Sequence, residues 1–265
     1  MGHNCQYRRD IILSKSDLKD IAEIKHLSIQ NAEKDYLLEI ILYTISNIRR
    51  LLVFKGGTAL YKFYNLNRFS EDLDFDIIAK RFNVSKFIND TKRNLELIGM
   101  KRTLSDLKEY SNEINIKFTI RGPLYDGRKE SMSRVTINLS KREQPKKIDE
   151  KLLIGRYPEI PSFSLCILDA KEIAAEKVRC ILTREKPRDV YDIWFLFKKG
   201  ISIDIKTINM KLKIHRFEFN LDKFHEKLYE KNKMWELDLR DLIPGDLPDF
   251  NSIATDIKKW SYDWK

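Results

Sequence analysis

Two adjacent glycines after a short apolar segment most constrain how this chain can fold. Residues 51–54 are apolar, as in a buried strand, and Gly56 and Gly57 follow almost at once. Glycine adopts positive φ easily and lets another group approach the backbone, so the pair predicts a tight strand-to-helix turn. Thr58 is a residue type that caps helices, and we expect a short helix from there to about residue 64.

A second predicted strand begins near Asp72 and gathers carboxylates on one face. Because side chains alternate along a strand, Asp72, Asp74 and Asp76 share one face, and the apolar residues between them share the other. Positions two apart are roughly 6 to 7 Å apart at the backbone. Asp72 and Asp74 can therefore converge on one Mg²⁺ or on a pair of ions, whereas Asp76 lies too far along. An isolated Asp-x-Asp pair, however, is more typical of a solvated strand edge.

The glycine turn supplies the other half of a candidate phosphate site. Backbone N–H groups at the start of a helix bind anions, so Gly56, Gly57 and Thr58 are candidate nucleotide contacts. A phosphate held there would lie near Asp72 and Asp74, and the negative charges would require a bridging cation. The predicted cofactor is Mg²⁺, with Mn²⁺ as the alternative.

A predicted helix in the second half of the chain carries a lysine on its apolar side. Lys177 lies four residues after Ile173 and four before Ile181, so it faces inward with them. A lysine in that place either reaches a buried anion or extends its ammonium group to the surface. Two interpretations remain open: a contact with a triphosphate, which the glycine turn and the Asp-x-Asp pair favour, and an internal ion pair with Asp189 or Asp192.

The segment after that lysine helix holds two more candidates. Asp189 begins the next predicted helix, and from the sequence alone it best fits an N-cap, with Asp192 as a structural residue one turn later. Arg184 lies about two helical turns beyond Lys177. It faces either the site or the solvent.

The glycine and aspartate segments together resemble a known signature. Gly57-Thr58, thirteen further residues and then Asp72-Leu73-Asp74-Phe75 are similar to the signature of the polymerase-β-like nucleotidyltransferases. The longer string FKGGTALYKFY…RFSEDLDF resembles more narrowly the AbiEii/AbiGii family of abortive-infection toxins. The lysine helix and the following PRDVYD segment match the later motifs of that family.

The resemblance implies an activity and a set of site residues. It implies transfer of NMP from an NTP to an acceptor such as the 3′ end of tRNA, by a growth-arresting toxin with a cognate antitoxin. It also gives Asp189 a functional role. Together with the residues proposed above, the predicted catalytic residues are Asp72, Asp74, Lys177 and Asp189. The predicted nucleotide-binding residues are Gly56, Gly57, Thr58, Lys177 and Arg184, and the predicted metal ligands are Asp72 and Asp74. Two other functions stay open: NMP transfer to a protein side chain, and an RNA- or nucleotide-binding module with degraded catalysis.

The chain departs from the polymerase-β-like pattern at one position. Such sites usually take a third carboxylate from a neighbouring strand, and the residue that aligns best here is Asn138, with Asn115 as the other polar strand position. An amide oxygen binds Mg²⁺ less strongly than a carboxylate. Either the site holds one tightly bound ion, or Glu113 supplies the third acid.

Charge and cysteine content narrow the partners and the compartment. Fifty Lys and Arg residues against forty Asp and Glu residues give a net charge of +10, which fits either a polyanionic partner or simply a basic surface. Three widely spaced cysteines indicate neither a zinc site nor a disulfide framework, and a reducing cytoplasm fits them. The polar first ten residues and the lack of a long apolar run predict neither a signal peptide nor a membrane span.

The order of predicted elements indicates an α/β (α+β) fold with a mixed-sheet nucleotidyltransferase lobe followed by a helical lobe. Residues 113–120 and 134–140 alternate as strands, a basic linker occupies residues 141–151, and the chain becomes helical from residue 169. The prolines at 158 and 161 place the boundary between domains 1–157 and 158–265. Basic residues that could meet RNA cluster in the linker and in the helical lobe: Arg142, Lys146, Lys147 and Lys151, and Lys198, Lys199, Lys206, Lys211, Lys213 and Arg216.

Overall fold

A mixed sheet forms the centre of the first lobe in the computed structural model, which describes residues 13–264. Within that range the sheet has seven strands in the order β3-β4-β5-β2-β1-β7-β6. Strand β2 pairs parallel with β5 and antiparallel with β1, and β1 pairs parallel with β7. The strands are β1 (Leu52–Lys55), β2 (Asp72–Ile77), β3 (Arg102–Glu109), β4 (Glu113–Ile120), β5 (Ser133–Ser140), β6 (Ile148–Leu153) and β7 (Phe163–Leu168). The predicted mixed sheet is confirmed.

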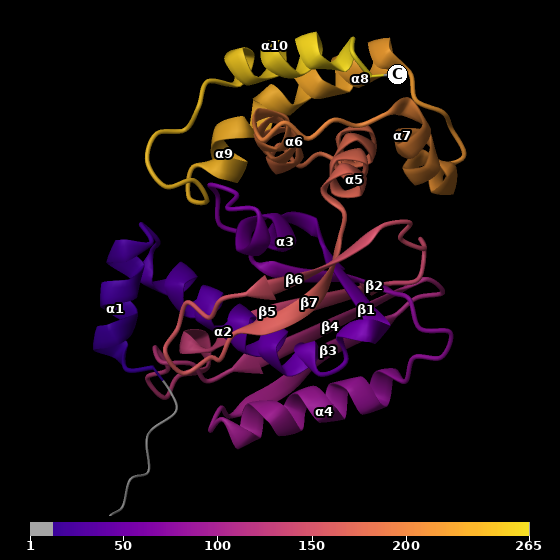
Figure 1. Ribbon diagram of the computed structural model, residues 1–265. Helices are drawn as coiled ribbons and strands as arrows, with labels where there is room; N and C mark the ends of the chain where they lie inside the picture. Colours follow the sequence, from indigo (N-terminus) through magenta and orange to yellow (C-terminus); the bar gives the residue numbers. More distant parts are fainter. Residues whose placement is uncertain (1–12, 265) are drawn as a thin grey trace, which may run out of the picture.

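Helices lie on both faces of this sheet, and the later ones form a lobe of their own (Figure 1). Helices α2 and α4 cover one face, and the α5–α10 group lies beyond the other face together with α3. The helices are α1 (Lys15–Ile24), α2 (Ile29–Ser46), α3 (Gly56–Phe63), α4 (Val84–Leu97), α5 (Ala170–Thr183), α6 (Arg188–Lys198), α7 (Ile205–Leu212), α8 (Leu221–Glu230), α9 (Trp235–Leu239) and α10 (Phe250–Ser261). Short 3₁₀ turns are η1 (Arg49–Leu51), η2 (Lys129–Ser131), η3 (Lys213–His215) and η4 (Lys231–Met234).

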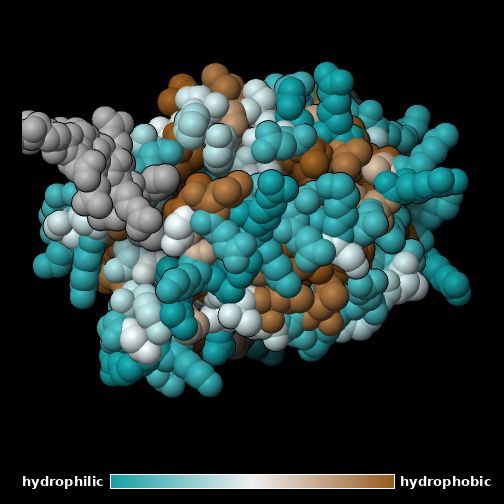
Figure 2. Space-filling view, turned by 90° about the horizontal axis from the view of Figure 1, so that it is seen from below, coloured by the Kyte–Doolittle hydropathy of each residue, from teal (hydrophilic) through white to brown (hydrophobic). Residues whose placement is uncertain are grey.

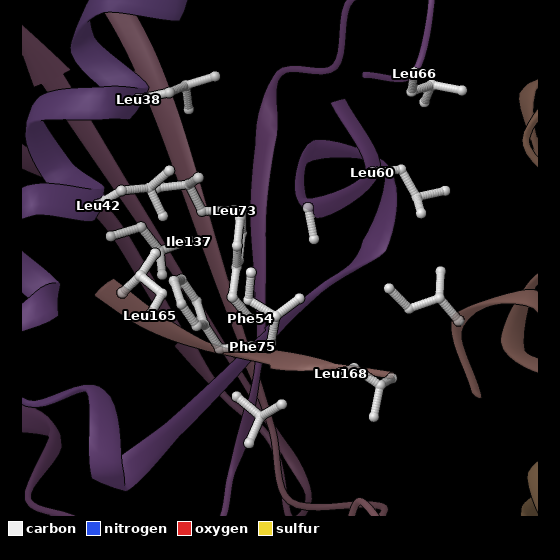
Figure 3. Packing of buried hydrophobic residues seen from close by; sticks show 14 of the residues in the cluster. Leu38, Leu42, Phe54, Leu60, Leu66, Leu73, Phe75, Ile137, Leu165 and Leu168 are labelled. Atoms are coloured by element: carbon white, nitrogen blue, oxygen red, sulfur yellow. The ribbon is translucent and has the colours of Figure 1, made fainter. Parts of the chain in front are cut away.

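The apolar face of β2 fixes which way its carboxylates point. Leu73 and Phe75 are buried, and they pack in one cluster with Leu38 and Leu42 of α2 (Figure 3). Burying a side chain of this size contributes about 1.5–3 kcal/mol. A shift of one residue in register would bring the aspartates into this core, so β2 keeps its acidic face toward the helical lobe.

Three strands, β3, β6 and β7, lie where the sequence pattern predicted none. Strand β6 overlaps the predicted basic linker, and only Leu153 of it is buried, so the strand carries little apolar periodicity. Strand β7 follows the predicted boundary at Pro158 and belongs to the sheet through its pairing with β1. We therefore propose that the two lobes divide at Asp169, the N-cap of α5, rather than at Pro158.

Several sequence-based expectations concern targeting and cysteines. The polar first ten residues and Cys5 lie outside the described residues. Cys166 and Cys180 are free thiols. None of the helices between residues 13 and 264 combines the length and the apolar character needed to cross a bilayer.

Candidate active site

A polar cavity of about 260 Å³ lies between the sheet and α5. Its walls come from both lobes: Gly56 and Asp74 from the α3 and β2 side, Asn138 from β5, and Lys177 and Arg184 from α5 and its C-cap. The structure therefore brings together five residues that the sequence analysis named from four separate segments.

Gly56 allows the backbone to pass directly beneath the Asp74 carboxylate. Its φ is +77°, a left-handed conformation that side-chain-bearing residues rarely adopt. A Cβ atom on Gly56 would also lie 2.5 Å from Asp74 Oδ2, which is far inside contact distance. Glycine is thus required there both for its conformation and for its size, as the turn pattern predicted.

An amide row connects Asp74 to its neighbouring strands. Strand register places Asn138 beside Asp74 and Asn115 beside Asn138, so the predicted third-ligand position is adjacent to the carboxylate. Asn138 Nδ2 donates to Asp74 Oδ1 at 2.9 Å, and Asn115 Nδ2 donates to Asn138 Oδ1 at 2.7 Å. Glu113, the other candidate acid, lines the cavity and pairs with Arg142 at 2.7 Å.

Asp72 shares the face of Asp74 one pleat away and is crowded by negative charge. Burial, followed by the carboxylates of Asp74 and Glu71, raises the pKa of Asp72. A divalent cation would relieve that repulsion, and carboxylate oxygens are ligands that Mg²⁺ accepts. Across residues 13–264, no three His, Cys, Asp or Glu side chains form a metal-binding group. The residues present fit one ion held by Asp72 and Asp74, with an amide rather than an acid in the third place.

Asp76 shares the strand face of Asp72 and Asp74 but forms an ion pair instead of joining them. This agrees with its exclusion from the predicted metal-binding pair. Its side chain is fully buried and lies 2.8 Å from Lys55 Nζ, which also meets Glu176 Oε1 of α5 at 3.1 Å. This chain of charges joins β2 to α5 across the back of the cavity. Its burial among carboxylates raises the pKa of Asp76 to about 7, despite the nearby Lys55.

The expectation that Thr58 caps the following helix is wrong. Helix α3 begins one turn earlier, with Lys55 at the N-cap position and no side-chain cap bond. Thr58 is fully buried, and its Oγ1 donates to the backbone oxygen of Asp72 at 2.6 Å and lies 2.9 Å from Ser70 Oγ. The hydroxyl group therefore fixes the start of β2, and the structure places it away from the lining of the cavity.

Arg68 is the main site residue that the sequence analysis did not single out. It is 1% exposed, and its Nε and Nη2 atoms donate to the two carboxylate oxygens of Asp192, each at 2.7 Å. A Cβ atom on Gly57 would lie 2.6 Å from Arg68 Nη2, so the second glycine makes room for this guanidinium group. The only sequence signal was its position inside the string that carries the family resemblance.

Lys177 sits between two aspartates of α6. Its Nζ is 2.9 Å from Asp189 Oδ1 and 2.6 Å from Asp192 Oδ2. Burial alone would lower the pKa of Lys177, but the two carboxylates raise it above its usual range. The internal ion pair left open by the sequence is therefore present, with both candidate partners. An ammonium group has three donors, so one remains beyond these two contacts.

The N-cap expected at Asp189 is wrong for a related reason. Pro187 occupies the N-cap position of α6, without a side-chain cap bond. The Asp189 carboxylate instead accepts from Arg184 Nε at 2.7 Å and Nη2 at 2.8 Å, besides Lys177. Burial opposes its ionisation, yet Lys177 and Arg184 hold the pKa of Asp189 well below its usual range.

These contacts form one charged cluster, which we call the α5–α6 cluster: Arg68, Lys177, Arg184, Asp189 and Asp192. Three cations face two anions, so the cluster keeps one excess positive charge at the wall of the cavity. The Arg184 side chain is 49% exposed, the most open of the cations in the cluster. The site thus places Asp74, with Asp72 beside it on the same strand face, opposite a wall of net positive charge, which suits a metal-bound polyphosphate.

Comparison with solved structures gives the same fold. JHP933 from Helicobacter pylori is 24% identical with a TM-score of 0.55, over 89% of this chain and 92% of that one. MenT4, a nucleotidyltransferase toxin from Mycobacterium tuberculosis H37Rv, is 18% identical with a TM-score of 0.65, over 93% of this chain and 88% of that one. At these identities the likeness concerns the fold. No functionally curated protein matches the chain.

The sequence profile of one family covers most of the chain. The profile described as "Nucleotidyl transferase AbiEii toxin, Type IV TA system" matches residues 40–265. This range includes the glycine turn, the Asp-x-Asp strand and the α5–α6 cluster. The chain therefore belongs to the AbiEii family of nucleotidyltransferase toxins of type IV toxin–antitoxin systems.

Proposed function

We propose that the chain transfers NMP from an NTP to the 3′-terminal hydroxyl group of an RNA, with tRNA as the acceptor, and thereby arrests growth in the cytoplasm until a cognate antitoxin counters it. In this reaction the acceptor oxygen forms a bond to the α-phosphorus, the bond from that phosphorus to the bridging oxygen breaks, and pyrophosphate leaves. The acceptor hydroxyl loses its proton. Membership of the AbiEii family supports the transfer, and the basic net charge of +10 supports a polyanionic acceptor.

The observation that carries the proposal is the meeting of three features in one cavity. Asp74 lines the cavity from β2 with the half-buried Asp72 next to it on the same strand face, the Gly56 turn brings backbone beside Asp74, and the net-positive α5–α6 cluster closes the other side. Each feature alone has an ordinary structural explanation. Together they provide the cation ligands and the positive charge that nucleotide transfer requires.

Asp72 and Asp74 would hold Mg²⁺, or Mn²⁺ in its place. When bound, the ion supplies positive charge for the attacking oxygen and the departing pyrophosphate. The chain's own residues support this arrangement: Asn138 holds one oxygen of Asp74 by a 2.9 Å hydrogen bond, and Thr58 fixes the backbone at Asp72.

Lys177 and Arg184 would neutralise the phosphates of the NTP. Lys177 has a donor left after its two aspartate contacts, and Arg184 exposes about half of its side chain at the cavity. Asp189 would then orient both cations, since its carboxylate accepts from each of them.

Labelling with NTPs tests the proposal against its alternatives. The purified chain is incubated with each α-labelled NTP, Mg²⁺ and either total RNA or total protein, and the labelled products are separated on denaturing gels. We expect label in RNA of tRNA size, sensitive to removal of the terminal nucleotide. Label in protein alone would show NMP transfer to a side chain. Binding of NTP or RNA without any labelled product would show a module with degraded catalysis.

A further inference from the structure

Two hollows continue outward from the active-site cavity along the surface of the helical lobe. The first, of about 250 Å³, shares Arg142 and Glu143 with the cavity. The second, of about 750 Å³, shares Met210 and Lys213 with the first. The three concave regions therefore adjoin one another, from Asp74 on β2 to the turn after η3.

The outer part of this path presents cations without protein partners. Lys206, Lys213 and Arg216 are exposed, and within residues 13–264 none of them forms an ion pair. They lie on α7, on η3 and at the left-handed residue that follows η3. Glu218 lines the same hollow, so three cations face one carboxylate there and leave a net positive charge that favours an anionic partner.

Lys211, on the same helix, was expected to belong to this basic group, and that expectation is wrong. Its side chain is buried, and its Nζ lies 2.7 Å from Glu143, 3.1 Å from Glu172 and 3.2 Å from Glu176. This cation fastens α7 to α5 and to the segment after β5. The position of α7 relative to the cavity is therefore fixed, and with it the position of the unpaired cations.

Apolar side chains form the floor between the charges. Ile205, Met210 and Phe217 line the outer hollow and are each half-buried. The Phe217 ring also lies 5.4 Å from Lys223 Nζ. Phosphates beside an aromatic and aliphatic floor suit unpaired nucleotides, whose bases expose their faces, better than a duplex, whose bases are stacked inside.

We propose that this α7 surface, formed by Lys206, Met210, Lys213, Arg216 and Phe217, binds the single-stranded RNA segment that precedes the acceptor 3′ end. The inference rests on the proposed function, and it adds the route by which the acceptor strand leaves the cavity. The charges match a polyanion, and the path is continuous with the candidate active site.

Removal of the three charges tests the surface directly. In the Lys206→Gln, Lys213→Gln, Arg216→Gln variant, side-chain length and helix propensity are largely kept. Binding of a fluorescent single-stranded RNA, measured by anisotropy without NTP, should weaken on the order of 10- to 100-fold near 0.1 M salt. The log–log dependence of affinity on salt should become shallower by about 2, since each phosphate contact on a single strand contributes about 0.7. NTP affinity should stay that of the parent protein.

A matched control removes three cations from α4, on the opposite side of the sheet. Lys86, Lys92 and Arg93 belong to α4. This helix lies at the bottom of Figure 1, and Figure 2, viewed from below, shows a largely hydrophilic surface with scattered hydrophobic residues. Their replacement by glutamine should leave both the RNA affinity and the salt slope unchanged. Phe217→Leu keeps the packing and removes the aromatic ring, so it should weaken RNA binding without changing the slope.

Two results would overturn the inference: parental RNA affinity and salt slope in the α7 variant, or an equal loss in the α4 variant. Because RNA binding is read without nucleotide, failure of NMP transfer leaves this test intact. Conversely, if the protein labels RNA and the α7 variant binds RNA as tightly as the parent, the proposed function stands and the RNA-binding role of the α7 surface is refuted.

Discussion

Arg68 and Asp192 join the two lobes by a buried, two-point ion pair. The guanidinium group comes from the loop before β2 and the carboxylate from α6, with both contacts at 2.7 Å and both side chains almost inaccessible to water. Asp192 also meets Lys177, so the pair continues into the cavity wall. Disruption of this pair should therefore affect both the stability of the fold and the geometry of the site.

We expect Asp192→Asn to destabilise the protein by about 3–5 kcal/mol, because it leaves Arg68 and Lys177 buried with less negative charge between them. Chemical denaturation measures this loss. The matched exposed pair, Asp126 with Arg128, should tolerate Asp126→Asn with little change. An equal effect of the two substitutions would contradict the assigned role of Asp192.

The same pair predicts how stability depends on pH. Burial opposes ionisation of Asp192, but Arg68 and Lys177 lower its pKa below the ordinary 3.8. Its contribution is therefore complete above about pH 4 and is lost as the pH falls through the lowered pKa. Asp192→Asn should flatten the acid side of the stability profile. If the stability of the variant falls with acid as steeply as that of the parent protein, carboxylates other than Asp192 cause the acid dependence.

Gly56→Ala should reduce NMP transfer strongly, because the added methyl group meets Asp74 Oδ2 at 2.5 Å. The left-handed backbone adds about 1–2 kcal/mol of strain. Gly200 has the same φ of +77° with open space around it, so Gly200→Ala carries the strain without the clash. Both variants should lose the stability that backbone strain costs, but only Gly56→Ala should lose activity and Mg²⁺-dependent stabilisation. Parental activity in Gly56→Ala would refute the close approach to Asp74.

Asn138→Asp should tighten Mg²⁺ binding or raise activity, because it adds a third carboxylate beside Asp74. Without metal the variant should be less stable, since the hydrogen bond to Asp74 is replaced by like-charge repulsion. Melting temperature against Mg²⁺ concentration reports both effects. A strong loss of both metal affinity and activity would show that the Asn138 amide has a different role, such as hydrogen bonding to the nucleotide.

Lys177→Met should weaken NTP binding and slow transfer, since methionine keeps most of the packing and removes the charge. The variant should also unfold more easily, because Asp189 and Asp192 lose a shared partner. Isothermal titration with NTP below the melting range separates the two effects. Normal NTP affinity in a destabilised protein would make Lys177 a positioning residue only.

Local pattern was sufficient to predict the residues that act through their own segment. Alternation along β2 placed Asp72 and Asp74 on one face, and the glycine pair predicted the turn at Gly56. These predictions need only the geometry of a strand and the conformational freedom of glycine. The position of Asn138 was predicted differently, from the resemblance to the polymerase-β-like pattern, and the structure places this residue beside Asp74.

Residues whose role depends on a distant partner could not be predicted in the same way. Arg68 and Asp192 are 124 positions apart, and the sequence around either residue does not indicate that they pair. Thr58 and Asp189 have types that favour helix caps, but tertiary contacts with Asp72 and Lys177 determine their orientation. The charge of Lys211 indicated a surface residue, although three glutamates bury it.

The most direct test of the account compares NMP transfer by Asp72→Asn and Asp74→Asn with transfer by the parent protein, in labelled-NTP assays with Mg²⁺. Both variants should be inactive and folded. The melting temperature of Asp72→Asn without metal should hold or rise, because burial and neighbouring carboxylates already disfavour its charge. Inactive, stably folded variants would support a catalytic centre at this carboxylate pair. Full activity in either variant would contradict it.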